Sequence, residues 1–170
     1  MSSLSAAPPL LSPRTAALYV AIAAAGLLAT VFVMEYGFGV APCNLCLLQR
    51  WPHGAVIPLA ALAFVPGISN SGRCYLLLLC AAAFATTAGI GVYHVGVEQG
   101  IFEGPTACSG SITGDSIEEL RRQLMAAPIV KCNEVAWSLF GISLAGYNVV
   151  ASSALAVFSA VIGLRGLMAK

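Results

Sequence analysis

Four long apolar stretches follow one another along the chain, and shorter polar or turn-forming segments separate them. The apolar stretches cover about 16–34, 47–65, 74–97 and 139–163. Each approaches or exceeds the roughly 20 residues that an α-helix needs to cross a bilayer. The pattern therefore predicts an all-α integral membrane protein, a four-helix bundle in which every apolar stretch is a membrane span.

The ends of this pattern suggest one membrane domain with a short tail. Residues 1–13 are rich in Ser, Ala and Pro and have no apolar period, which predicts a disordered cytoplasmic tail ahead of a single domain over 14–170. A cleaved signal peptide is the alternative interpretation of the first stretch. Ala16 to Met34 carries no charge and exceeds the usual signal core of about 7–15 residues, so we expect a retained helix.

One shorter helix is expected between the third and fourth spans. Ser116 and Glu119 have the spacing of a capping box. The apolar residues that follow share one helix face, and Pro128 ends the segment; they are Ile117, Leu120, Leu124 and Met125. This amphipathic helix would either lie flat on the membrane surface or pack on its own loop.

Composition supports lipid as the solvent. The chain is 59% hydrophobic and only 9% charged, whereas a soluble domain has about 25% charged residues. Its mean hydropathy is +0.89. The net charge of +1 gives no electrostatic basis for binding nucleic acid.

The distribution of charge predicts the orientation of the bundle. Basic residues without acidic neighbours flank both chain ends and the 66–73 turn, namely Arg14, Arg73, Arg165 and Lys170. All seven acidic residues lie in or beside the other two loops, although the longer one also holds Arg121, Arg122 and Lys131. By the positive-inside rule, both termini face the cytoplasm, and loops 35–46 and 98–138 face outward.

This orientation divides the six cysteines into two groups. Cys43, Cys46, Cys108 and Cys132 fall on the outer side, where disulfides persist, and they pair most simply as Cys43–Cys46 and Cys108–Cys132. The other two cysteines lie in the third span, Cys74 at its cytoplasmic end and Cys80 within it. Both are expected to be reduced and buried, acting as small hydrophobic residues.

The Cys43-x-x-Cys46 pair is the main candidate for chemistry. There are two alternatives to a redox role. The pair could form half of a zinc site that the other two outer cysteines complete, or it could form a structural disulfide. Arg50 lies four residues after Cys46, so the two share a face if a helix begins near Cys46. A helix N-terminus and a nearby cation both lower a thiol pKa, so Cys46 is expected to be a thiolate at neutral pH.

Several motifs in order resemble the DsbB family of bacterial inner-membrane disulfide-generating proteins. They are Pro42-Cys43-x-x-Cys46-x-x-x-Arg50 opening the second span, Tyr93-His94 closing the third, the pair Cys108 and Cys132, and Trp137 before Leu139-Phe140-Gly141. The Met-Pro-x-Trp stretch of the family is replaced by Ala145-Gly146-Tyr147 here, so no role is transferred from that proline.

The resemblance implies a mechanism and its participants. A soluble periplasmic thioredoxin-fold partner of the DsbA type would attack Cys108, and the released Cys132 would attack Cys43. Cys46 would then face ubiquinone or menaquinone held near Arg50 and His94. The protein would be a quinone-dependent oxidoreductase of the bacterial inner membrane, with its active cysteines on the periplasmic side.

Other interpretations remain open at this point. A reductase of the vitamin K epoxide type also combines four helices with Cys-x-x-Cys, but its motif lies late in the bundle. A structural or zinc-binding four-span protein is the non-enzymatic alternative. His53 is expected to be structural, and Glu35 and Gln49 are candidates to hydrogen-bond residues of the site.

Overall fold

The computed structural model describes residues 12–105, 116 and 131–169. Its elements are α1 (Pro13–Phe32), the π-helical turn η2 (Val33–Gly37), α2 (Asn44–Leu62), α3 (Asn70–Glu98), strands β1 (Ser138–Leu139) and β2 (Ile142–Ser143), and α5 (Leu144–Met168). The described part is therefore mostly helical, as the apolar pattern predicts, with one antiparallel two-stranded hairpin added.

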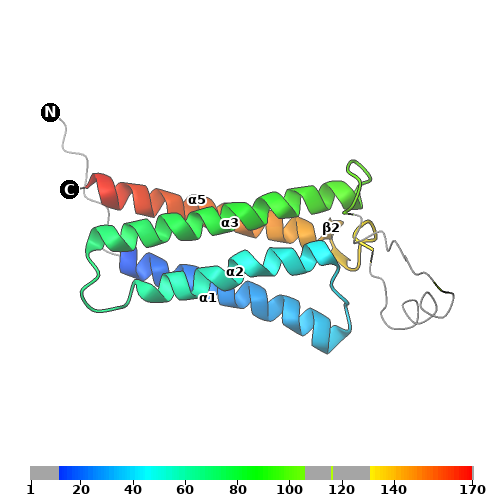
Figure 1. Ribbon diagram of the computed structural model, residues 1–170, viewed down its shortest axis with the longest axis horizontal. Coiled ribbons are helices and arrows are strands. Elements are labelled where there is room, and N and C mark those ends of the chain that lie inside the picture. Colours follow the sequence, from blue (N-terminus) through cyan, green and yellow to red (C-terminus); the bar gives the residue numbers. More distant parts are fainter. Residues whose placement is uncertain (1–11, 106–115, 117–130, 170) are drawn as a thin grey trace.

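The four long helices run alternately up and down in one elongated bundle (Figure 1). Helix α3 packs most extensively, against α5 and α2, and α1 packs mainly against α2. The start of α1, the turn between α2 and α3, and the end of α5 lie at one end, called here the inner end. The η2–α2 connection, the end of α3 and the hairpin lie at the opposite, outer end.

Helix boundaries follow local capping chemistry. The side chains of Ser12, Ser69 and Ser143 each accept a backbone N–H from the first turn of α1, α3 and α5. The fourth span was predicted to start at 139, but α5 starts at Leu144. Phe140 and Gly141 both have positive φ, at 51° and 78°, and form the hairpin turn that delays the helix.

Two of the predicted segments lie largely outside the residues that the structure describes. Residues 1–11 of the predicted tail lie outside the described residues, and α1 already begins at Pro13. The short helix expected after Ser116 also lies outside them.

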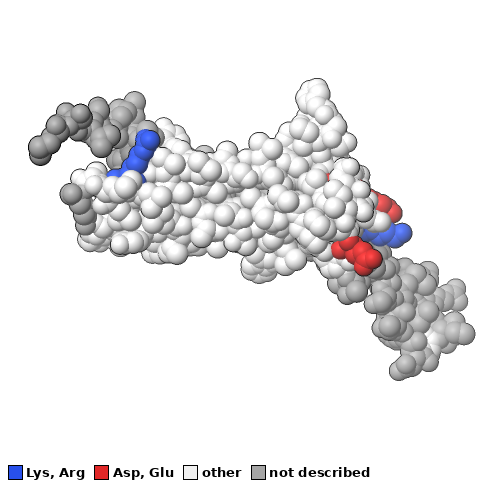
Figure 2. Space-filling model, turned by 90° about the horizontal axis from the view of Figure 1, so that it is seen from above, with Lys and Arg blue, Asp and Glu red and all other residues white. Residues whose placement is uncertain are grey.

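Three helical segments of the described residues are long and apolar enough to cross a membrane: Pro13–Gly37, Asn70–Glu98 and Leu144–Met168. Helix α2, with Pro52 and Pro58 inside it, is not among them. Large apolar side chains are exposed along the flanks, for example Ile22 at 60% and Val157 at 63%. On the face seen in Figure 2, charged side chains gather at the two ends. Such a surface fits a multi-pass membrane protein.

The inner half of the bundle has a closely packed apolar core. It is built from small residues of α1 and larger ones of α2, α3 and α5, including Ala16, Val20, Val56, Leu77 and Phe84. Small residues let the helix backbones approach closely, which is how helices pack in lipid. This core holds the outer ends of the helices in place around the site described next.

Candidate functional site

The Cys43–Cys46 pair forms the first turn of α2 at the outer end. Cys43 is the N-cap residue in extended conformation, and its Sγ atom accepts the Cys46 backbone N–H at 3.4 Å. The two Sγ atoms are 3.3 Å apart and neither is in a disulfide. The spacing of the motif places both sulfurs on the same turn, so that an ionised sulfur receives hydrogen bonds from the other thiol and from the helix N-terminus.

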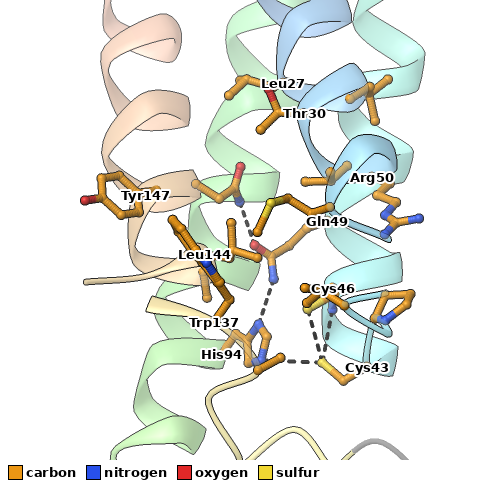
Figure 3. Close-up of a pocket in the computed structure, with 18 of the residues that line it drawn as sticks. Leu27, Thr30, Cys43, Cys46, Gln49, Arg50, His94, Trp137, Leu144 and Tyr147 are labelled. Carbon is orange, nitrogen blue, oxygen red and sulfur yellow. Dashed lines mark hydrogen bonds between the residues drawn. The ribbon is translucent and has the colours of Figure 1, made fainter. Parts of the chain in front are cut away.

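His94 comes from α3 and completes a small buried cluster. Its Nε2 atom is 3.5 Å from Cys43 Sγ (Figure 3). The same atom is 3.8 Å from Glu98 Oε1. His94 is only 2% exposed and Cys43 is 5% exposed. The predicted proximity of His94 to the cysteine motif is therefore seen in the structure, and the nearer sulfur is that of Cys43.

These contacts favour Cys43 over Cys46 as the ionised sulfur. The pKa of Cys43 is lowered to about 4; the Cys46 thiol is the largest cause, burial opposes it, and the His94 ring and the Cys46 backbone N–H also contribute to the lowering. The sequence suggested the opposite assignment, with Cys46 as the thiolate. That suggestion placed the helix start at Cys46, whereas α2 is capped by Cys43.

Arg50 has a different partner from the one expected. Its Nη1 atom donates to Glu35 Oε2 at 2.6 Å, and its guanidinium lies 5.1 Å from the centroid of the Phe32 ring. Glu35 lies in the π-helical turn, and such turns often occur at functional sites. Arg50 thus joins α2 to the end of α1 and still lines the same cavity as Cys46.

A cavity of about 270 Å³ opens beside the cysteine pair. Its lining is mostly apolar, with Leu27, Val31, Met34, Trp137, Leu144 and Ala151 among the residues that contribute to it. The polar side chains around it include Arg50, Gln49, His94 and Asn148. An apolar cavity with a few convergent polar groups is the usual form of a small-molecule site.

Cys132 is 2% exposed and packs in the same buried cluster as Cys43, Leu45 and Val97. It is disulfide-bonded. Its predicted partner, Cys108, lies outside the described residues. A disulfide sulfur offers no thiolate to a metal, so this state disfavours the alternative of a zinc site with four cysteines.

The remaining two cysteines lie away from this site. Cys80 belongs to the inner core, and both Cys74 and Cys80 are 0% exposed. Neither is in a disulfide. This burial agrees with the expectation that they act as small hydrophobic residues.

Sequence reasoning missed Asn148, which reaches the site from α5. Its Nδ2 atom donates to Gln49 Oε1 at 2.6 Å, and its Oδ1 atom is 2.9 Å from His53 Nε2. An available signal was overlooked, because Asn148 and Ser152 are polar residues within an apolar stretch. Polar groups inside a membrane are costly and are retained where they have partners or a function.

Comparisons with known proteins show the family of this chain. The family model described as "Disulfide bond formation protein DsbB" matches residues 13–162. Disulfide bond formation protein B of Marinobacter nauticus is 33% identical over 83% of this chain and 86% of its own length. Disulfide bond formation protein B 2 of Pseudomonas putida is 33% identical over 85% of this chain and 86% of its own length.

A further relative carries no functional name. It is the uncharacterized protein RP370 of Rickettsia prowazekii, 30% identical over 77% of this chain and 76% of its own length. No solved structure gives a significant match. With a family match over most of its length and an outer cysteine pair beside an apolar cavity, this chain belongs to the DsbB family and is a membrane oxidoreductase that generates protein disulfides.

Proposed function

We propose that this protein reoxidises a periplasmic DsbA-like dithiol and passes the electrons through two cysteine pairs to a membrane quinone, ubiquinone or menaquinone. One observation carries the proposal: Cys43 and Cys46 line an apolar cavity, and the disulfide-bonded Cys132 packs beside Cys43. Electrons would enter the Cys43–Cys46 pair from Cys132 and leave it to an acceptor in the cavity.

The entrance relies on Cys108 and Cys132. The thiolate of the partner would attack Cys108 and form a mixed disulfide, which releases Cys132 as a thiolate. Cys132 would then attack Cys43 of an oxidised Cys43–Cys46 pair and release Cys46. The second partner thiol resolves the mixed disulfide, so the partner leaves oxidised. The disulfide between Cys43 and Cys132 is resolved when Cys108 takes Cys132 back, leaving Cys43 and Cys46 reduced.

The cavity fits a quinone head group in size and chemistry. About 270 Å³ accommodates a single substituted ring, and the lining is apolar apart from a few polar side chains. When bound, the quinone would supply a two-electron, two-proton acceptor that re-forms the Cys43–Cys46 disulfide. Cys46 would face the ring, Arg50 would orient one oxygen, and His94 would hold a proton near Cys43.

We further propose the orientation in the bacterial inner membrane. Helix α2 would cross it together with the other three long helices, because it runs antiparallel between α1 and α3 (Figure 1). Its 19 residues span about 28 Å at 1.5 Å each, close to the hydrocarbon thickness of about 30 Å. Arg14, Arg73 and Arg165 belong to the inner end, which would make it cytoplasmic and place the cysteine site in the periplasm.

The test is turnover by the purified full chain with a reduced DsbA-type protein and ubiquinone. We expect stoichiometric quinol and oxidised partner. An Arg50→Leu variant should raise the KM for quinone about tenfold or more, since a charged contact is worth about 1.5–3 kcal/mol. Arg73→Leu is the matched control, because Arg73 donates to the Ala63 carbonyl at the inner end. Normal turnover by a Cys46→Ser variant would refute the proposal.

A further inference from the structure

A chain of buried hydrogen bonds connects three helices behind Cys43. Gln49 of α2 faces His94 of α3 (Figure 3), and the other side of its amide meets Asn148 of α5. Its Nε2 atom is 3.0 Å from His94 Nδ1, and its Oε1 atom accepts from Asn148 Nδ2 at 2.6 Å. Gln49 is only 6% exposed, so the protein itself must satisfy both ends of the amide.

A contact with the Leu45 backbone carbonyl shows which end of the Gln49 side-chain amide is the nitrogen. The amide nitrogen lies 3.1 Å from the Leu45 carbonyl oxygen, which can only accept. One amide hydrogen is thereby assigned to Leu45, and the other faces His94 Nδ1. Nδ1 must then be the accepting, unprotonated nitrogen of the ring.

The contacts of Asn148 independently support the same orientation of the Gln49 side-chain amide. Thr87 Oγ1 donates its single proton to the Gln49 backbone carbonyl oxygen at 3.0 Å. The same Thr87 Oγ1 atom can therefore only accept from Asn148 Nδ2, which lies 3.2 Å away. The nitrogen of Asn148 therefore faces both Thr87 and Gln49 Oε1. Two separate backbone carbonyls thus fix the direction of the whole chain of hydrogen bonds.

We propose that Gln49 is a positioning residue that holds His94 as the Nε2–H tautomer and so directs an imidazole N–H at the Cys43 sulfur. A neutral imidazole with an accepting Nδ1 carries its proton on Nε2, the atom that lies 3.5 Å from Cys43 Sγ. This inference deepens the proposed function because it explains how the thiol that receives electrons is kept ionised.

Close packing leaves the Gln49 amide little freedom to turn. A Cβ atom added to Gly91 of α3 would lie 2.8 Å from Val149 Cγ2, 3.3 Å from Asn148 Nδ2 and 3.4 Å from Gln49 Oε1. The missing side chain at this glycine allows α3 to approach α5 while the two amides remain between the helices. A Cβ atom there would displace Val149 and crowd Asn148, the partner of Gln49.

Other charged groups around Cys43 are accounted for in the test. Cys46 lies on the same turn, and His94 and Glu98 face the pair from α3. Arg50 and Glu134 also line the cavity. None of these is altered by a change at Gln49, so a difference in the reactivity of Cys43 reports on the imidazole.

The experiment measures alkylation of Cys43 in the reduced, quinone-free full chain by peptide mass spectrometry across pH. Gln49→Leu should slow alkylation about tenfold at about pH 5 and leave it within about twofold at about pH 9. Gln99→Leu, at the exposed C-cap of α3, is the matched control.

Equal profiles for Gln49→Leu and the unaltered protein would overturn the proposal. If Gln49→Leu does not fold, ¹⁵N-histidine NMR of the unaltered protein decides, since the chain has only two histidines. An Nε2–H tautomer of His94 supports the proposal and an Nδ1–H tautomer overturns it. Neither measurement needs partner or quinone, so their outcome is independent of the turnover test.

Discussion

The two halves of the bundle use the same four helices to build different interiors. The inner half is filled by apolar side chains, with Val20, Leu77 and Phe84 fully buried. The outer half contains a cavity and a set of hydrogen-bonded polar side chains around Gln49 and Asn148. The inner half thus provides packing, and the outer half holds the cysteine pair and its polar neighbours beside a cavity.

Cysteine shows what this difference means for chemistry. Cys80, in the inner half, is enclosed by the apolar core, and cysteines buried in this way are inert. Cys43, in the outer half, is also buried but receives a thiol, a backbone N–H and an imidazole within 3.5 Å. Burial therefore does not decide reactivity, whereas the hydrogen-bond donors around the sulfur do.

The largest expected effect separates these two cysteines directly. Cys43→Ser should reduce quinone-dependent oxidation of a reduced DsbA-type protein more than about a thousandfold, because the sulfur that exchanges electrons is lost. Cys80→Ala should retain activity within about twofold. Loss of activity in a Cys80→Ala protein that keeps its helical circular dichroism would contradict the comparison.

The second prediction concerns the pH dependence of Cys43 in the reduced protein. Because its pKa is lowered to about 4, alkylation should stay constant down to about pH 5 and fall as pH drops through that pKa. The ionised sulfur stabilises the reduced fold above the pKa of the unfolded thiol, and this contribution is lost as pH falls through about 4. Both effects have the sign expected for a depressed pKa.

Cys46→Ala removes the largest cause of that depression. The alkylation midpoint should move upward toward the ordinary thiol value of about 8.5, so the variant should react more than about tenfold slower at about pH 6. The measurement is the same peptide mapping, with Cys74→Ala as the control. An unchanged midpoint would show that the helix N-terminus and His94 suffice without the second thiol.

The smallest effect compares two buried serines of α5. Ser159 Oγ has no hydrogen-bond partner among the described residues, whereas Ser152 Oγ donates to Asn148 Oδ1 at 2.9 Å. Ser159→Ala should be neutral or should raise the free energy of unfolding by about 1 kcal/mol, and Ser152→Ala should lower it by about 1 kcal/mol. Unfolding in mixed micelles measures both, and a reversed order would contradict the assigned network.

Much of this could be predicted from local sequence. The apolar stretches predicted the four long helices because each helix buries or exposes apolar surface along its whole length. The motif around Cys43 and Cys46 predicted that the two sulfurs lie close together, because its spacing is confined to one helical turn. The start of α5 was misplaced because Phe140 and Gly141 are apolar by composition but adopt a turn.

The sequence alone determined the membrane environment, the helical class and the cysteine pair at the start of α2, since these depend on composition and on residues within a few positions of one another. Only the tertiary structure decided that Arg50 pairs with Glu35, that His94 faces Cys43, and that Gln49 and Asn148 meet behind it. The physical reason is that each of these contacts joins different helices, and their relative rotation and approach are set by packing that no local pattern records.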